Sequence, residues 1–195
     1  MLNPYSFTID GDLSRADVVV LATLCRGAKV VEYGVGASTI LLSEVANKVI
    51  SYDTDMNWIM KTQPKIKNNN TELKLILKEN GVVKPIVEEC DVLFDDGHSL
   101  LRAEFLLEFW PYIKKCAILH DSRMTYAGNC VKRFIDAFVA NTEPTVGNPN
   151  KLPDNHHTGS LERIEWNHLE SNMVVLFKRN CTLLYENWKI TETQK

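Results

Sequence analysis

Residues 30–53 read VVEYGVGASTILLSEVANKVISYD and predict a strand, a glycine turn, a helix and a second strand in succession. The β-branched valines at the start favour the first strand. Gly34 and Gly36 predict a tight turn at which a ligand can approach bare backbone. A helix that opens near Ala37 would direct its first N–H groups at that ligand. The second strand ends in Asp53, so the stretch predicts a binding loop in an α/β fold.

The polar residues of this stretch indicate the kind of ligand. A dinucleotide fingerprint requires G-x-G-x-x-G, and Thr39 stands at the third glycine position. Glu32 would repel a phosphate but attract an ammonium or sulfonium group. Ser38 and Thr39 can form hydrogen bonds with a zwitterionic amino acid, and Asp53 can accept hydrogen bonds from both hydroxyls of a ribose. The loop is therefore less suited to a pyrophosphate than to a cationic ligand.

Composition predicts one soluble domain with no nucleic-acid or membrane partner. The 195 residues are 45% hydrophobic, which is enough to bury one sizeable core. A net charge of −3 and an isoelectric point near 6.0 argue against general electrostatic binding to nucleic acid or to a membrane surface. The N-terminus MLNPYSFTIDGDLSR has acids where a signal peptide needs basic and apolar residues. Five widely spaced cysteines are typical of a reduced cytoplasmic protein, and a homodimer is one option for its oligomeric state.

Strands and helices alternate along the chain, which predicts a Rossmann-like three-layer α/β sandwich. We expect a largely parallel sheet of seven strands whose last strand is antiparallel, because a short turn joins the final two. The expected single domain covers 1–195, with an N-terminal helical extension at 1–27 and a lid or substrate loop at 142–160. Besides 30–53, helices are expected at 12–26 (capped by Asp12 or Ser14), 55–62, 99–112 and 128–140, and strands at 73–77, 92–94, 117–119, 161–166 and 173–177.

Acidic residues follow four of the expected strands. They are Glu32, Asp53, the pair Asp95 and Asp96, and Asp121. Because ligands of open α/β sheets bind beyond the carboxyl ends of the strands, these acids converge on the edge where a ligand would lie. Each of them could instead cap the helix that follows, which is a common structural role for a single acid. Acids at four strand ends together favour a site.

Three segments carry a resemblance to a known family. The pattern E-x-G-x-G at 32–36 resembles motif I of the class I S-adenosylmethionine-dependent methyltransferases. CDVLFDDGHS at 90–99 and AILHDSR at 117–123 are similar to stretches of small-molecule O-methyltransferases of the macrocin and catechol type. The resemblance implies a methyltransferase fold with S-adenosyl-L-methionine as cofactor. By it, the acid and glycines of the first pattern surround the methionine moiety, and Asp53 holds the ribose.

The same resemblance implies a divalent cation. Asp96 and Asp121 correspond to acids that bind Mg²⁺ or Mn²⁺ in several of these enzymes, and Asp96 would also border the cofactor. The cation would orient vicinal hydroxyls of an acceptor and lower their pKa. This chain has Ser122 where the catechol type has an asparagine or a second acid. His98 and His120 lie beside these acids and are candidate bases, although a metal would make a histidine base unnecessary.

The leading hypothesis is methyl transfer from S-adenosylmethionine to an oxygen of a small molecule or sugar. An NAD-type oxidoreductase is a second class, favoured by Asp53 and disfavoured by Thr39 and Glu32. A non-catalytic nucleotide-binding or assembly protein of the same fold is a third. The sequence identifies neither the acceptor nor the base.

Overall fold

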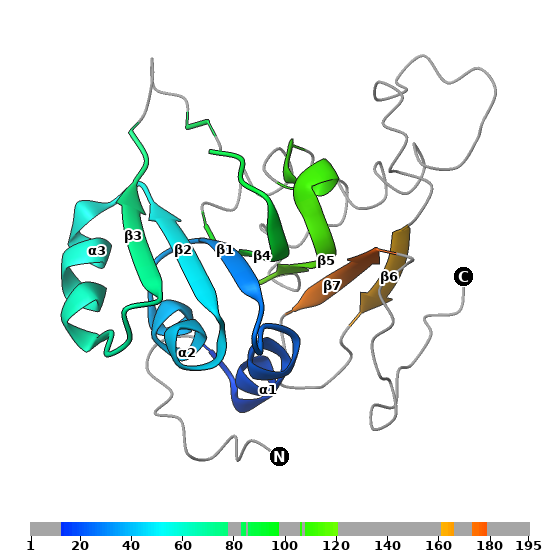
Figure 1. Ribbon diagram of the computed structural model, residues 1–195, viewed down its shortest axis with the longest axis horizontal. Coiled ribbons are helices and arrows are strands. Elements are labelled where there is room, and N and C mark those ends of the chain that lie inside the picture. Colours follow the sequence, from blue (N-terminus) through cyan, green and yellow to red (C-terminus); the bar gives the residue numbers. More distant parts are fainter. Residues whose placement is uncertain are drawn as a thin grey trace.

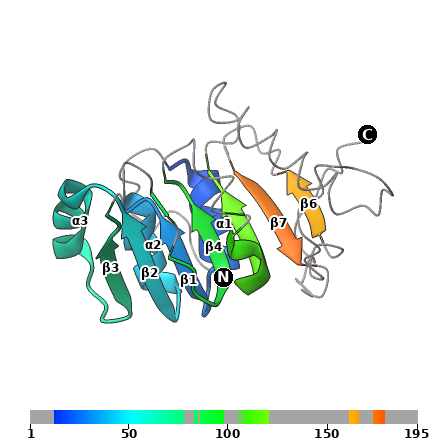
Figure 2. The same ribbon diagram turned by 90° about the horizontal axis from the view of Figure 1, so that it is seen from above.

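A seven-stranded sheet forms the centre of the structure, a computed structural model that describes residues 13–77, 83, 84, 86–97, 106, 108–120, 161–165 and 173–178 (Figure 1 and Figure 2). The strands are β1 (Lys29–Tyr33), β2 (Lys48–Asp53), β3 (Thr71–Leu75), β4 (Cys90–Asp95), β5 (Ile113–Leu119), β6 (Leu161–Glu165) and β7 (Val174–Lys178). Six of these strands run in one direction, and β7 is antiparallel to both of its neighbours. The expected fold class is therefore confirmed.

The strand order is β3-β2-β1-β4-β5-β7-β6. The chain builds outward from β1 to β3 and then returns to place β4 on the other side of β1. Open α/β sheets bind ligands at such a reversal, beyond the carboxyl ends of the strands. Tyr33, the last residue of β1, pairs with Tyr52 on one side and with Asp95 on the other. The ends of β1, β2 and β4 consequently lie side by side at one edge of the sheet.

Three α-helices are described over their whole length: α1 (Arg15–Leu24), α2 (Ala37–Val45) and α3 (Met56–Thr62). Short 3₁₀ turns follow at η2 (Gln63–Lys65) and η3 (Trp110–Tyr112). Ser14 caps α1, as one of the two expected caps, through a reciprocal pair of hydrogen bonds with Asp17. Asp55 caps α3 by accepting from the Asn57 N–H at 2.8 Å. None of these described helices has the length and apolar character needed to cross a bilayer.

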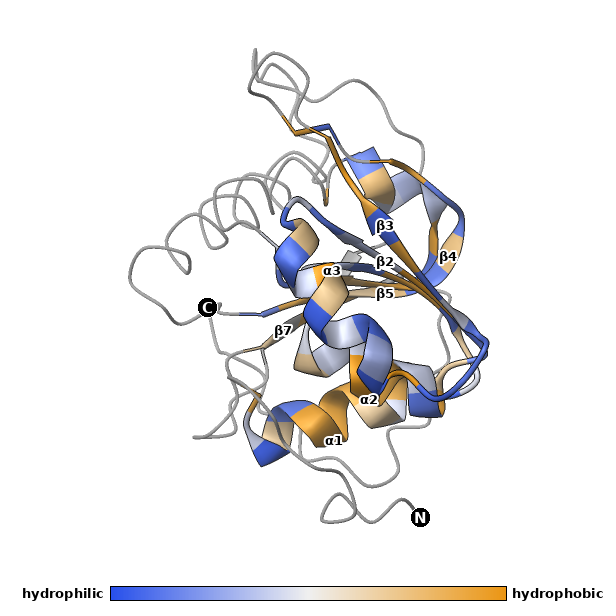
Figure 3. Cartoon of the chain, turned by 90° about the vertical axis from the view of Figure 1, so that its left-hand side faces the viewer, coloured by the Kyte–Doolittle hydropathy of each residue, from blue (hydrophilic) through white to orange (hydrophobic). Residues whose placement is uncertain are grey.

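Both faces of the central strands β1 and β4 are buried, and successive residues of a strand point to opposite faces. Val30 and Phe94 face α1 and α2, where Leu21 of α1 is fully buried. Val31 faces the other way and packs in a second cluster that contains Trp110. The apolar stretch of α1 is visible in Figure 3. This helix, expected in an N-terminal extension, is therefore a part of the core.

Two strand boundaries differ from the expected ones. β3 begins at Thr71 because the preceding residue, Asn70, is fixed by its side-chain amide, which donates to the Ser43 and Ala46 carbonyls at the end of α2. β5 begins at Ile113, four residues before the expected strand. The sequence did not indicate this earlier start, because Lys114 and Lys115 conceal the alternating pattern of the strand. Only the end of the helix expected at 99–112 is described. The expected helix at 128–140 and the expected lid at 142–160 lie outside the described residues.

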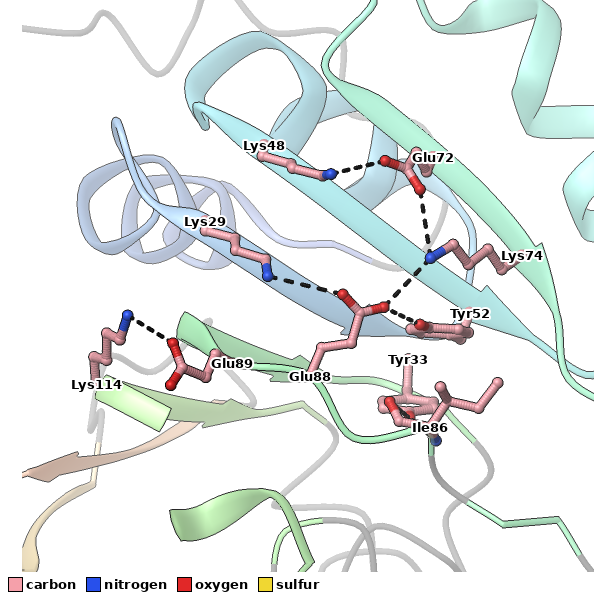
Figure 4. A network of polar contacts seen from close by, with 10 residues as sticks. All are labelled: Lys29, Tyr33, Lys48, Tyr52, Glu72, Lys74, Ile86, Glu88, Glu89 and Lys114. Atoms are coloured by element: carbon pink, nitrogen blue, oxygen red, sulfur yellow. Dashed lines mark hydrogen bonds and ion pairs between the residues drawn. The ribbon is translucent and has the colours of Figure 1, made fainter. Parts of the chain in front are cut away.

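A polar network holds residues 86–88 against the sheet (Figure 4). The Tyr33 hydroxyl donates to the Ile86 carbonyl at 3.3 Å and accepts from the Ile86 N–H at 2.9 Å. The Tyr52 hydroxyl donates to the Glu88 carboxylate at 2.5 Å, and the Lys74 ammonium lies 3.3 Å from the same oxygen. Burial opposes ionisation of Glu88, but the hydrogen bonds from Tyr52 and Lys74 hold its pKa below the usual range. The network therefore fixes both tyrosine rings.

Candidate functional site

A pocket of about 280 Å³ lies at the carboxyl ends of β1, β2 and β4, where the strand order reverses. Three of the predicted site residues line it, namely Gly34, Asp53 and Asp96. The other lining residues are Tyr33, Tyr52, Thr54, Asp55, Trp58, Ile76, Val83 and Gly97. The structure thus brings together two of the predicted acids and one predicted glycine from three different strand ends.

Tyr33 and Tyr52 contribute aromatic surface to the pocket. Their rings stack with 5.3 Å between centroids and 20° between planes, and the ring of Phe109 meets Tyr33 edge-on at 5.6 Å. Both tyrosines are buried. Neither was predicted as a site residue, because each fits the pattern of an apolar strand residue. The available signal was an aromatic residue at or next to the end of two neighbouring strands.

Asp53 connects the loop after β1 with the loop after β2. Its Oδ2 accepts from the Val35 N–H and its Oδ1 accepts from the Asp55 N–H, each at 2.8 Å. These bonds fix the carboxylate at the end of β2. A carboxylate oxygen has more than one acceptor site, so each oxygen can also accept from a ligand hydroxyl. The geometry therefore suits the predicted contact with a ribose.

Glu32 lies beneath the loop and has no exposed surface. Its carboxylate accepts from the Ser38 hydroxyl at 2.5 Å and from the Ser51 hydroxyl. Thr39, also fully buried, accepts from the Gly36 N–H at 2.9 Å. Burial raises the pKa of Glu32 to about 7, against the lowering effect of the hydroxyl hydrogen bonds. Glu32, Ser38 and Thr39 do not line the pocket: they brace the loop, and a contact with the cofactor stays a prediction for them.

Gly34 is required by a contact within the protein. Its φ of +95° is a conformation that side chains rarely adopt, and a Cβ there would lie 2.7 Å from the Asp96 carbonyl oxygen. The Asp96 N–H in turn donates to the Tyr33 carbonyl at 2.8 Å. The sequence predicted that a ligand approaches bare backbone at this glycine, whereas the structure places the backbone of the β4 loop there. Gly36 differs, because its φ of −175° is extended and a Cβ added to it would meet no atom within 4 Å.

His120 is buried between two acids. Its Nδ1 is 3.0 Å from Oδ1 of Asp96, and its Nε2 is 3.5 Å from Oδ2 of Asp17 in α1. Only 2% of His120 is exposed, and its role as a base stays a prediction. Asp17 was not predicted as a site residue. Its signal in the sequence was a charged residue among the apolar residues of the buried helix face.

The other predicted catalytic and metal-binding residues, His98 and Asp121, lie outside the described residues. Within the described ranges, no group of three or more His, Cys, Asp or Glu side chains could hold a metal ion. Asp96 is the described member of the predicted metal pair, and one of its oxygens contacts His120. The metal therefore stays a prediction.

Several solved structures are similar to this chain. An O-methyltransferase from Bacillus cereus, solved with S-adenosylhomocysteine, has a TM-score of 0.58 at 12% identity over 90% of this chain and 86% of its own. TomG from Streptomyces achromogenes, an O-methyltransferase of tomaymycin synthesis solved with S-adenosylmethionine, also has a TM-score of 0.58 at 12% identity, over 85% and 80%. The tRNA (m1A58) methyltransferase TrmI from Aquifex aeolicus has a TM-score of 0.56 at 13% identity, over 88% and 72%. This chain has the methyltransferase fold.

Sequence comparison adds no relative, since no protein-family profile and no curated protein sequence matches the chain. At 12–13% identity, the likeness concerns the methyltransferase fold. The chemistry of the site therefore rests on the side chains of this chain.

The contact between Gly34 and the Asp96 backbone predicts unequal effects of two alanine substitutions. Gly34→Ala should lower the free energy of unfolding by about 2–3 kcal/mol, because it combines a close contact with an unfavourable φ. Gly36→Ala is the matched control and should cost less than about 1 kcal/mol, the usual difference between these residues at a helix start. Urea denaturation measures both values. Equal losses would contradict the assigned contact.

Burial of Glu32 predicts a pH dependence of stability. Its pKa is raised from an ordinary 4.5 to about 7, so its contribution to stability is complete below about pH 4.5 and is lost as the pH rises to 7. Relative to Glu32→Gln, the wild type should lose up to about 3 kcal/mol between pH 4.5 and pH 8. Urea denaturation across this range measures the difference, with the exposed Glu44→Gln as control. A difference that does not vary with pH would show that Glu32 is not buried as a neutral acid.

Proposed function

We propose that this chain is an S-adenosylmethionine-dependent methyltransferase that acts on an oxygen of a small molecule or sugar. The observation that carries the proposal is the pocket at the reversal of the strand order, with the Asp53 carboxylate beside Gly34 and Asp96. The methyltransferase fold supports it, because the proteins that share this fold include two O-methyltransferases solved with S-adenosylmethionine or its product. The resemblance at 90–99 and 117–123 supports the choice of an oxygen acceptor.

The walls of the pocket suit the nucleoside part of the donor. Asp53 accepts from the ribose hydroxyls, with both of its oxygens already oriented by backbone N–H groups. Ile76 and Val83 offer apolar surface to the adenine ring. Trp58 lines the same pocket and is 49% exposed, which leaves its ring accessible for stacking. The nucleoside would therefore lie across the ends of β2 and β3.

The acids of the site favour the charged donor over its neutral product. Asp96 borders the pocket on the β4 side, where a carboxylate attracts the sulfonium and ammonium groups of S-adenosylmethionine. In the transfer, the acceptor oxygen forms a bond to the methyl carbon as the bond between carbon and sulfur breaks, and the sulfonium becomes a thioether. The acceptor hydroxyl also loses its proton, which passes to a base or to water. The contribution of the protein is mostly the alignment of donor and acceptor.

The acceptor class is proposed from charge as well as from resemblance. A net charge of −3 is unfavourable for binding a polyphosphate backbone and compatible with a small acceptor. One protein with the same fold is a tRNA methyltransferase, so the fold itself accommodates both acceptor classes. A tRNA acceptor is the alternative that an activity assay with both substrates would separate.

The donor site is tested by calorimetric titration with S-adenosylhomocysteine and with NAD. The wild type should bind the sulfur ligand, and Asp53→Asn should weaken this binding by roughly 1–3 kcal/mol, because it loses charge-assisted hydrogen bonds to the ribose. Glu44→Gln, an exposed change on α2, is the control and should bind like the wild type. Binding of NAD with no heat from the sulfur ligand would reject the methyltransferase in favour of an oxidoreductase.

A divalent metal held by Asp96 and Asp121 is a further part of the proposal. Carboxylate oxygens are the ligands that Mg²⁺ prefers, and the bound ion would lower the pKa of acceptor hydroxyls. Methyl transfer to a catechol should then stop in EDTA and return with Mg²⁺ or Mn²⁺. Asp121→Asn should reduce the transfer at least about tenfold while donor binding is retained. Full activity in EDTA would exclude the metal.

A further inference from the structure

A buried acid in α1 is connected to the pocket by an imidazole. Asp17 is 1% exposed and His120 is 2% exposed. The Asp17 carboxylate faces Nε2 of His120 at 3.5 Å, and the opposite ring nitrogen faces the Asp96 carboxylate at 3.0 Å. Of these three residues, only Asp96 lines the pocket. We propose that Asp17 is a positioning residue that acts through His120 to set the orientation of the Asp96 carboxylate.

The capping role of Asp17 does not account for its burial. Its carboxylate accepts from the Ser14 N–H at 2.8 Å, which completes the cap of α1. A cap of this kind also works at an exposed helix end. Burial of a carboxylate is costly unless it has a polar or charged partner, and His120 is such a partner for Asp17. The burial therefore points to a second role.

Asp17 and His120 can influence only the side-chain orientation of Asp96, because the backbone around it is already fixed. The backbone of Asp96 is already fixed, because its N–H donates to the Tyr33 carbonyl at 2.8 Å and its carbonyl packs on Gly34. The backbone of His120 is fixed by a hydrogen bond from its N–H to the Asp95 carbonyl at 3.1 Å. What remains is the rotation of the two side chains. An imidazole ring whose Nε2 lies 3.5 Å from the Asp17 carboxylate would transmit the position of that acid to the Asp96 carboxylate on its other side.

This inference rests on the proposed function, in which Asp96 borders the charged donor. It gives His120 a role besides the predicted one of base. With each ring nitrogen next to an acid, His120 acts on the orientation of Asp96. Asp17 and His120 thus make α1 part of the donor site, although this helix packs in the apolar core against the sheet.

A double-mutant cycle on binding of S-adenosylhomocysteine tests the coupling. Asp17→Asn should raise the dissociation constant about tenfold in the wild-type background and less than about twofold in the Asp96→Asn background. Ser14→Ala is the matched control, because it removes the hydroxyl half of the cap and keeps the Asp17 carboxylate. It should lower the melting temperature and leave the dissociation constant within about twofold. Equal losses from Asp17→Asn in both backgrounds would overturn the inference.

A second readout does not need the ligand. In ¹⁵N NMR spectra, with His120→Gln used for assignment, Asp17→Asn should shift both ring-nitrogen resonances of His120 and Ser14→Ala should leave them in place. An unchanged His120 spectrum in Asp17→Asn overturns the inference. Failure of the wild type to bind S-adenosylhomocysteine, with the shifts present, counts against the proposed function alone. If Asp17→Asn does not fold, His120→Gln replaces it in the double-mutant cycle with Asp96→Asn. His120→Gln should then raise the dissociation constant about tenfold in the wild-type background and less than about twofold in the Asp96→Asn background.

Discussion

The buried carboxyl group of Glu32 is the interaction on which the binding loop depends. It accepts hydrogen bonds from Ser38 on α2 and Ser51 on β2. One side chain thereby joins the strand before the loop, the helix after it and the neighbouring strand. Complete removal from water disfavours the charged form and raises the pKa of Glu32 to about 7, while the two hydroxyls supply the partners that a buried acid requires. The hydrogen bonds of Glu32 therefore fix the loop between β1 and α2 without a ligand.

The shape of the pocket follows from this fixed loop. Gly34 meets the backbone of Asp96, which ties the loop after β1 to the loop after β4. Asp53 accepts from the Val35 N–H and ties the same loop to the end of β2. The stacked tyrosine rings at the ends of β1 and β2 are held by their hydroxyls (Figure 4). A ligand thus meets walls that are already positioned, which reduces the loss of conformational freedom on binding.

The sequence predicts the parts of this arrangement that depend on local signals. The helix after the glycine turn begins at Ala37 as expected, and Asp53 lines the pocket at the end of its strand. The burial of Glu32 was also predictable, because alternation puts it on the same face as Val30, yet its charge favoured a ligand contact. The contact of Asp17 with His120 was not predictable, because it joins distant parts of the chain and depends on how α1 packs across the sheet.

A crystal structure of this chain with S-adenosylhomocysteine tests the central claim most directly. We expect both ribose hydroxyls to lie within hydrogen-bond distance of the Asp53 carboxylate, with the adenine ring between Trp58 and Ile76 and the amino acid part near Asp96. Binding of the ligand away from the ends of β1, β2 and β4, or in this pocket with the ribose turned away from Asp53, would contradict the account.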